Sequence, residues 1–179
     1  NSINSNPGNS ISVAGYGFGN AYQGNIGRDV NCIAAVPDLK VTFAGSTTIT
    51  VGSNYSLTLT ATNIGTTATS GTYQIQTTLP AGISYLSSIG SAWSCSNISQ
   101  PNGITLINCQ SSEAINIASS KVLGLNLIAS NSLTNGSSIM INGVISGGGD
   151  TNVTNNNYTL NPTIINSSPN LTASMTGLA

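Results

Sequence analysis

The sequence contains no histidine and very few charged residues of either sign. Three Lys or Arg and four Asp or Glu occur among 179 residues, so 4% of the chain is charged and the net charge is −1, whereas about a quarter of an ordinary soluble domain is charged. The absence of His removes the commonest general base and metal ligand. Three basic residues cannot neutralise a run of phosphates, which excludes an electrostatic nucleic-acid binder. No apolar run approaches the roughly 18 residues of a membrane span.

The few acidic residues do not form an evident catalytic or metal site. Asp29, Asp38, Glu113 and Asp150 are scattered along the chain. The segment Gly147-Gly148-Gly149 before Asp150 has no P-loop Lys, so it is typical of a flexible turn. One carboxylate with nearby Asn carbonyls makes a poor calcium site. We therefore expect no catalytic residue, no metal and no cofactor, and we predict that the protein is not an enzyme.

Amides and hydroxyls replace the missing charge. The chain has 24 Asn, with many Ser, Thr and Gly, and these groups do not titrate between strongly acid and neutral pH. Carboxylate contributions to folding, which acid would remove, are nearly absent. This composition favours a harsh, acidic extracellular environment. The polar start at Asn1, without an initiator Met, is typical of a secreted chain whose signal peptide has been removed.

Acceptor triplets for N-linked glycans, Asn-x-Ser/Thr, are frequent. A chain this rich in Asn, Ser and Thr also produces such triplets by chance. As a group they predict an exported glycoprotein whose sugars supply surface hydration. The seven candidate sites are Asn54, Asn97, Asn135, Asn152, Asn157, Asn166 and Asn170.

The three cysteines predict one disulfide and one remaining thiol. Cys95 and Cys109 flank a polar segment that contains Asn102-Gly103, a favoured hairpin turn. In an oxidising compartment a disulfide would clamp that hairpin. Cys32 is then left over, either as a buried thiol, which we favour, or as a bond between chains.

The apolar pattern changes near residue 37. Residues 1–36 form a tail rich in Asn and Gly, in which a strand-like two-residue step separates Ile11 from Val13 and Tyr16 from Phe18. Residues 37–165 alternate in short runs separated by turn residues, without helical periodicity, and residues 166–179 form a second tail. The expected strands are 39–43, 55–62, 72–79, 83–86, 104–109, 122–129, 138–145 and 158–165. Seven or eight short strands predict an antiparallel β-sandwich with an extended N-terminal tail.

Several motifs of this domain resemble a known family of surface repeats. They are Pro37-Asp38-Leu39, Val51-Gly52, Tyr55-Ser56-Leu57-Thr58-Leu59-Thr60, Thr62-Asn63-Ile64-Gly65 and Leu79-Pro80-Ala81-Gly82-Ile83. Together they resemble the immunoglobulin-like "domain of unknown function 11" repeats, which often carry a disulfide where Cys95 and Cys109 stand. The resemblance implies an extracellular immunoglobulin-like sandwich of bacterial or archaeal surface proteins, without catalytic residues.

A narrower resemblance concerns how the chain assembles. One such domain, a strand-like tail, many sequons and little charge are similar to subunits of archaeal thread-type pili, which join by donor-strand complementation. A departure is that surface-repeat proteins usually carry many domains and more charge. The resemblance implies a pilin-like filament subunit whose partners are identical subunits and whose polymer serves adhesion and cell–cell contact.

The donor strand itself is an expectation about the N-terminal tail. In an incomplete sandwich, a strand from another chain would satisfy free backbone groups, and alternate side chains would fill pockets. Ile11, Val13, Tyr16 and Phe18 are the candidate pocket residues, and head-to-tail repetition gives a fibre. The alternatives are that the tail folds back as its own domain's first strand, that it stays disordered, or that residues 166–179 are the donor.

Two other interpretations remain open from the sequence. The chain could be a monomeric adhesin or carbohydrate-binding module for surface or cell-wall glycans, with Trp93 and six Tyr as stacking platforms; a surface-layer component is a third class. Separately, Lys40, Asn157 and Glu113 could form an isopeptide crosslink, with Glu113 as the acid. That reaction needs a buried, deprotonated Lys, and we favour a solvated Lys40 instead.

Overall fold

The computed structural model describes residues 3–5, 11–13 and 35–167. The chain divides into two compact units, Asn1–Ala35 and Val36–Ala179. In the first unit, β1 (Ile3–Ser5) pairs antiparallel with β2 (Ile11–Val13), so that Ile3 lies opposite Val13. Two of the candidate donor residues therefore stand on a strand that has a local partner.

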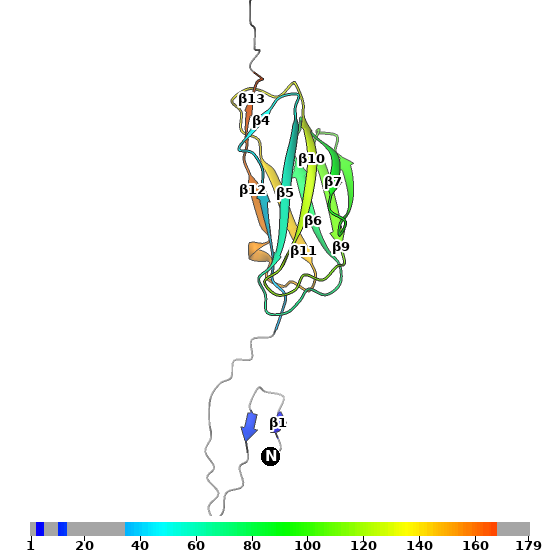
Figure 1. Ribbon diagram of the computed structural model, residues 1–179. Helices are drawn as coiled ribbons and strands as arrows, with labels where there is room; N and C mark the ends of the chain where they lie inside the picture. Colours follow the sequence, from blue (N-terminus) through cyan, green and yellow to red (C-terminus); the bar gives the residue numbers. More distant parts are fainter. Residues whose placement is uncertain (1–2, 6–10, 14–34, 168–179) are drawn as a thin grey trace, which may run out of the picture. The chain divides into compact units, whose positions relative to one another are not determined.

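The second unit is an immunoglobulin-like β-sandwich of two antiparallel sheets, which confirms the predicted fold class (Figure 1). The first sheet has the order β3-β5-β10-β7, and its strands are β3 (Leu39–Ala44), β5 (Asn54–Asn63), β10 (Ser120–Ala129) and β7 (Ile83–Ile89). The second has the order β12-β11-β6-β9-β8, with β12 (Asn157–Leu160), β11 (Ile141–Gly147), β6 (Tyr73–Leu79), β9 (Thr105–Ser111) and β8 (Ser94–Ser99).

A smaller parallel pair closes one end of the sandwich. The strands β4 (Thr48–Thr50) and β13 (Thr163–Ile165) run side by side, with Ile49 opposite Ile164. A 3-10 turn, η1 (Val153–Asn155), precedes β12. The domain begins at its lower end with Val36 and leaves its upper end after β13 (Figure 1).

The core follows from strict alternation along the strands. Leu39, Val41 and Phe43 of β3 face inward, as predicted, because side chains of a strand alternate between its two faces. The same period along β5 buries Leu57 and Leu59 and turns the intervening Ser and Thr outward. Burial of these aliphatic side chains, each stabilising by about 2 kcal/mol, holds the two sheets face to face.

The two sheets hold four and five strands, and this total of nine exceeds the seven or eight strands that we expected. The predicted run 158–165 is two strands, separated at Asn161-Pro162, where Pro162 cannot donate to a ladder. The polar edge strand β8 and the short β4 had no alternating apolar signal, so the sequence missed both. The predicted strand 138–145 begins only at Ile141.

Candidate interaction surfaces

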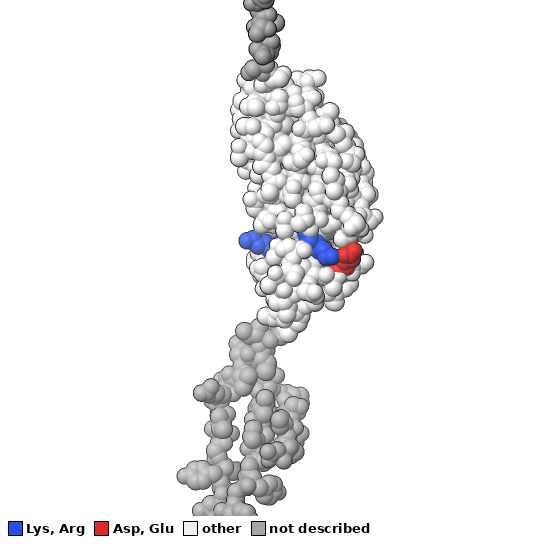
Figure 2. Space-filling view, in the orientation of Figure 1, with Lys and Arg blue, Asp and Glu red and all other residues white. Residues whose placement is uncertain are grey.

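The surface of the domain is almost without charge (Figure 2). Its charged residues are Asp38, Lys40, Glu113, Lys121 and Asp150. The face in Figure 2 is white except for a band of a few ionised side chains in its lower third. Among the residues that the structure describes, the ion pair between Lys121 and Glu113 is the one salt bridge. Contacts made by this surface therefore depend on shape, backbone groups and neutral side chains.

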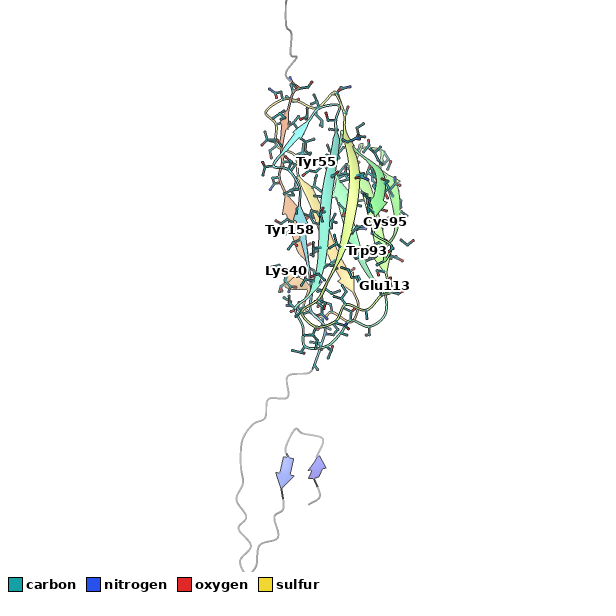
Figure 3. The ribbon with its side chains drawn as sticks, viewed as in Figure 1. Lys40, Tyr55, Trp93, Cys95, Glu113 and Tyr158 are labelled. Carbon is teal, nitrogen blue, oxygen red and sulfur yellow. A yellow bond between two sulfur atoms is a disulfide. The ribbon has the colours of Figure 1, made fainter. Side chains whose placement is uncertain are left out.

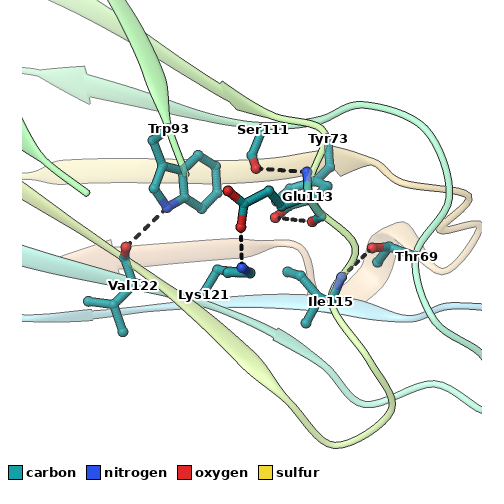
Figure 4. A network of polar contacts seen from close by, with 8 residues as sticks. All are labelled: Thr69, Tyr73, Trp93, Ser111, Glu113, Ile115, Lys121 and Val122. Atoms are coloured by element: carbon teal, nitrogen blue, oxygen red, sulfur yellow. Dashed lines mark hydrogen bonds and ion pairs between the residues drawn. The ribbon is translucent and has the colours of Figure 1, made fainter. Parts of the chain in front are cut away.

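The Lys121–Glu113 pair belongs to a network that closes the lower end of the sandwich (Figure 4). Tyr73 donates its hydroxyl to the Glu113 carbonyl at 2.9 Å, and the Ile115 N–H donates to Thr69 Oγ1 at 2.8 Å. The hydrogen bond to Glu113 raises the pKa of Lys121 above its ordinary value. This network ties the 112–119 loop to the sheets.

The residues considered for a crosslink are not brought together. Lys40 and Asn157 are exposed, and each lies on the solvent-facing side of a different sheet. Glu113 is paired with Lys121, and Figure 3 shows Lys40 and Glu113 at opposite sides of the domain. An exposed Lys stays hydrated and protonated, so the burial that such a reaction requires is missing at Lys40.

The fold brings together two carboxylates that the sequence separates. Asn152 joins them, since its Nδ2 donates to Asp38 Oδ2 at 3.1 Å and its backbone N–H donates to Asp150 Oδ1 at 2.8 Å. The remaining oxygens accept from Asn155 Nδ2 at 2.7 Å and from the Leu39 N–H at 3.1 Å. Within the described ranges, no group of three or more His, Cys, Asp or Glu could hold a metal ion. The cluster pins the start of β3 to the loop before β12.

The single Trp is unavailable as a sugar platform. Trp93 is 8% exposed, lies edge-on against Tyr73 with ring centroids 5.4 Å apart, and donates Nε1–H to the Val122 carbonyl at 3.0 Å. Tyr55 and Tyr73 are also buried. Stacking on a sugar needs an exposed ring face, so the carbohydrate-binding interpretation loses its best aromatic residue.

Six of the seven candidate glycosylation sites fall in the described part of the chain, and all six are exposed. They are Asn54, Asn97, Asn135, Asn152, Asn157 and Asn166. Two of them are neighbours, because Asn135 Oδ1 accepts the backbone N–H of Asn166 at 2.9 Å. Asn170 lies outside the described residues, as do Tyr16 and Phe18 of the candidate donor segment and residues 168–179 of the rival donor.

A disulfide joins Cys95 and Cys109 directly across the β8–β9 hairpin. The connecting turn contains Gly103 with φ +79°, a left-handed conformation that Gly adopts without a steric cost. Among the described strands, β9 is the single hydrogen-bonding partner of β8. The disulfide therefore adds a covalent link to an edge strand that its ladder with β9 otherwise holds. Cys32 lies outside the described residues.

The two lateral sides of the sandwich differ. On one side, β3 packs against β11 and β12, and the rings of Phe43 and Tyr158 lie 5.5 Å apart. On the other side, β7 packs against β9, so β8 extends past the first sheet and no described strand lies opposite it. We call this second side, made of the free edge of β7 and the inner face of β8, the uncovered edge.

No family model and no curated protein sequence matches the chain. Solved structures resemble it in fold. A CARDB domain from Pyrococcus furiosus, in complex with di-metal ions, has 16% identity and a TM-score of 0.49, covering 73% of this chain and 90% of that one. A cohesin module of a family 33 glycoside hydrolase from Clostridium perfringens has 11% identity and a TM-score of 0.49, covering 74% and 99%.

A C-terminal fragment of the major pilin GBS80 of Streptococcus agalactiae has 10% identity and a TM-score of 0.46, covering 72% of this chain and 56% of that one. These identities are too low for the likeness to extend beyond the sandwich fold. Separately, none of the described residues forms a helix long and apolar enough to span a membrane.

Proposed function

We propose that the chain is the structural subunit of an extracellular filament and that it polymerises head to tail by strand donation. The observation that carries this proposal is a sandwich with an unpaired strand edge, preceded by a separate unit of 35 residues that contains strands of its own. A free edge presents backbone N–H and C=O groups that another chain can pair with. The polymer would serve adhesion and cell–cell contact.

The sandwich changes the form that donation would take. Its first strand, β3, and its last strands, β12 and β13, are all present in the domain. Within the described residues each sheet is continuous, with no gap between its neighbouring strands. A donated strand would extend an existing edge, which is β-augmentation.

The neutral surface supports close assembly of identical copies. Electrostatic repulsion between subunits is weak when the net charge is −1. The disulfide favours an oxidising compartment, as expected of an extracellular protein. The described part of the domain also starts and ends at opposite ends of the sandwich, at Val36 and after β13, which suits a linear series of subunits (Figure 1).

N-linked glycans are a separate part of the proposal. The six described sequons are exposed and accessible to a transferase. Sugars at the positions that stay uncovered in the polymer would hydrate a surface that lacks ions. Peptide mapping of the native protein before and after deglycosylation tests this, and unmodified Asn at all of these positions would contradict it.

Electron microscopy of the full chain tests the filament itself. Negative-stain images of native material are compared with those of a variant that lacks residues 1–20. Long fibres that disappear on truncation support N-terminal donation. Persistent fibres would place the donor elsewhere, and single particles in both samples would contradict the filament proposal in favour of a monomeric adhesin.

A further inference from the structure

We infer that the acceptor of the filament is the uncovered edge, and that its occupant is the β2 segment, Ile11–Val13, of a second copy. This inference rests on the proposed function and specifies where one subunit holds the next. The added strand would pair with the free edge of β7 and lie over the inner face of β8, which would complete the four-stranded sheet opposite the five-stranded one.

The first argument is the mismatch between the sheets. Antiparallel partners share a face, so Asn97, opposite the fully buried Ile107, belongs to the inner side of its sheet. Ser99, opposite the buried Thr105, is on the same side. Both are nevertheless exposed. Their exposure shows that no described residue covers the inner face of β8, and one more strand beside β7 would supply a cover.

The second argument is the apolar surface next to this gap. Tyr85 faces inward from β7, opposite the buried Leu127, and is only partly buried. The Cys95–Cys109 disulfide lies inward on the facing sheet, and Cys95 is also partly buried. Figure 3 shows Cys95 on the β7 side of the domain. An added strand would therefore meet a half-exposed aromatic ring and a disulfide.

The occupant matches this surface in its alternation of apolar and polar residues. The sequence Ile11-Ser12-Val13 alternates apolar and polar residues, a pattern that gives a strand one apolar face and one polar face. The local β1–β2 ladder is three residues long, and an isolated two-stranded hairpin is marginally stable at best in water. Exchanging it for the β7 edge would replace an isolated two-stranded ladder with pairing at the edge of a packed sheet.

The opposite side of the sandwich is a poorer acceptor. The contact between Phe43 and Tyr158 fills the space between β3 and β12. Above it, β4 and β13 pair with each other. A strand added there would find its floor occupied by side chains of the same domain.

A pair of lysine substitutions on adjacent residues of β8 tests the acceptor. Asn97→Lys places a charge on the inner face, where an added strand would bury it. Ser96→Lys places the same charge on the outer face, since Ser96 lies opposite the outward Asn108. Because Asn97→Lys also removes a sequon, Asn97→Gln serves as the control for glycan loss.

The readout is polymer mass by light scattering and fibre length by electron microscopy of each full-length variant. We expect Asn97→Lys to reduce the polymer about tenfold or more, because an unpaired charge resists burial, while Ser96→Lys and Asn97→Gln assemble like wild type. Ser99→Lys is a second inner-face variant. Thermal unfolding of all variants establishes that the sandwich stays folded.

The outcomes separate the acceptor from the filament. If wild type polymerises and the inner-face and outer-face variants assemble equally well, the acceptor inference is wrong and the filament proposal stands. If wild type itself stays monomeric, both fail. Peptide mapping of native fibres gives an independent answer, because a glycan on Asn97 in assembled material is incompatible with a strand over it.

Discussion

Asn63 is a buried amide that organises the lower end of the domain. It is 0% exposed, and its Oδ1 accepts the backbone N–H groups of Asp38 at 3.2 Å and Gly65 at 3.0 Å. Its Nδ2 donates to the carbonyls of Thr67 at 2.7 Å and Ile115 at 2.9 Å. One side chain thus joins the start of β3 to two loops, and satisfies backbone groups that burial would otherwise leave unpaired.

Replacing this amide should be costly. We expect Asn63→Leu to lower the free energy of unfolding by about 3 kcal/mol, because it leaves buried backbone groups without partners. Asn116→Ala, at an exposed Asn, should change it by less than about 0.5 kcal/mol. Urea denaturation measures both, and equal small effects would show that the Asn63 network is dispensable.

Tyr55 and Lys121 make stability sensitive to alkaline pH. Burial raises the pKa of the Tyr55 hydroxyl above 10.0, and the hydrogen bond to Glu113 raises the pKa of Lys121 above 10.5. In both cases the folded state holds its proton more tightly than the unfolded state. Their stabilisation is fully present below the unfolded pKa and is lost as the pH rises through the folded pKa.

We therefore expect the melting temperature to fall when the pH rises above about 10. Tyr55→Phe should lose about 1 kcal/mol near neutral pH, because Tyr55 donates to the Ser46 carbonyl at 2.9 Å. The same variant should decline less steeply in alkali. Thermal unfolding between neutral and strongly alkaline pH checks both effects, and parallel curves would contradict the assignment to Tyr55.

At the scale of elements, the β8–β9 hairpin depends on its disulfide. The two cysteines are 14 residues apart, and closing a loop of this size stabilises the folded state by about 3 kcal/mol in the chain-entropy model. The double variant Cys95→Ala, Cys109→Ala should lose about that much. Urea denaturation measures the loss, and hydrogen exchange should show it concentrated in β8; unchanged protection of β8 would mean that its ladder suffices.

The strands were predictable where their apolar pattern was strong. The runs at 39–43, 55–62 and 122–129 became β3, β5 and β10, because alternate Val, Leu and Ile must face a core. β8 was missed because an edge strand without a facing sheet needs no alternation. Its exposed inner face, which carries our acceptor inference, is visible only from the register with β9.

At the scale of the whole domain, a force that pulls its two ends apart would load the β4–β13 pair in shear. The domain starts at its lower end with Val36 and ends at its upper end after β13 (Figure 1), while β4 and β13 are parallel neighbours. Flanking hydrogen bonds run from the Val51 N–H to the Ile165 carbonyl at 3.0 Å and from the Thr163 N–H to the Thr47 carbonyl at 2.9 Å. Pulling the two ends apart therefore loads these bonds together.

Single-molecule stretching should show this geometry. Handles at residues 36 and 167 should require a higher unfolding force than handles at Ser46 and Asn161, which separate β4 and β13 from one end and break their bonds in sequence. The comparison uses the same folded domain and changes only the direction of force. Equal forces in the two geometries would show that the β4–β13 pair bears no special load.

The sequence by itself determined the sandwich, its core faces and the neutral surface. These follow from side-chain alternation and composition, which are local properties of the chain. The linkage of Asp38 to Asp150 through Asn152 was decided by tertiary structure, because it forms only after the start of β3 meets a loop more than 100 residues away. Tertiary structure also decided the burial of Trp93 and the existence of the uncovered edge. Both depend on strand order and sheet width, which are set by the pairing of strands across the whole domain.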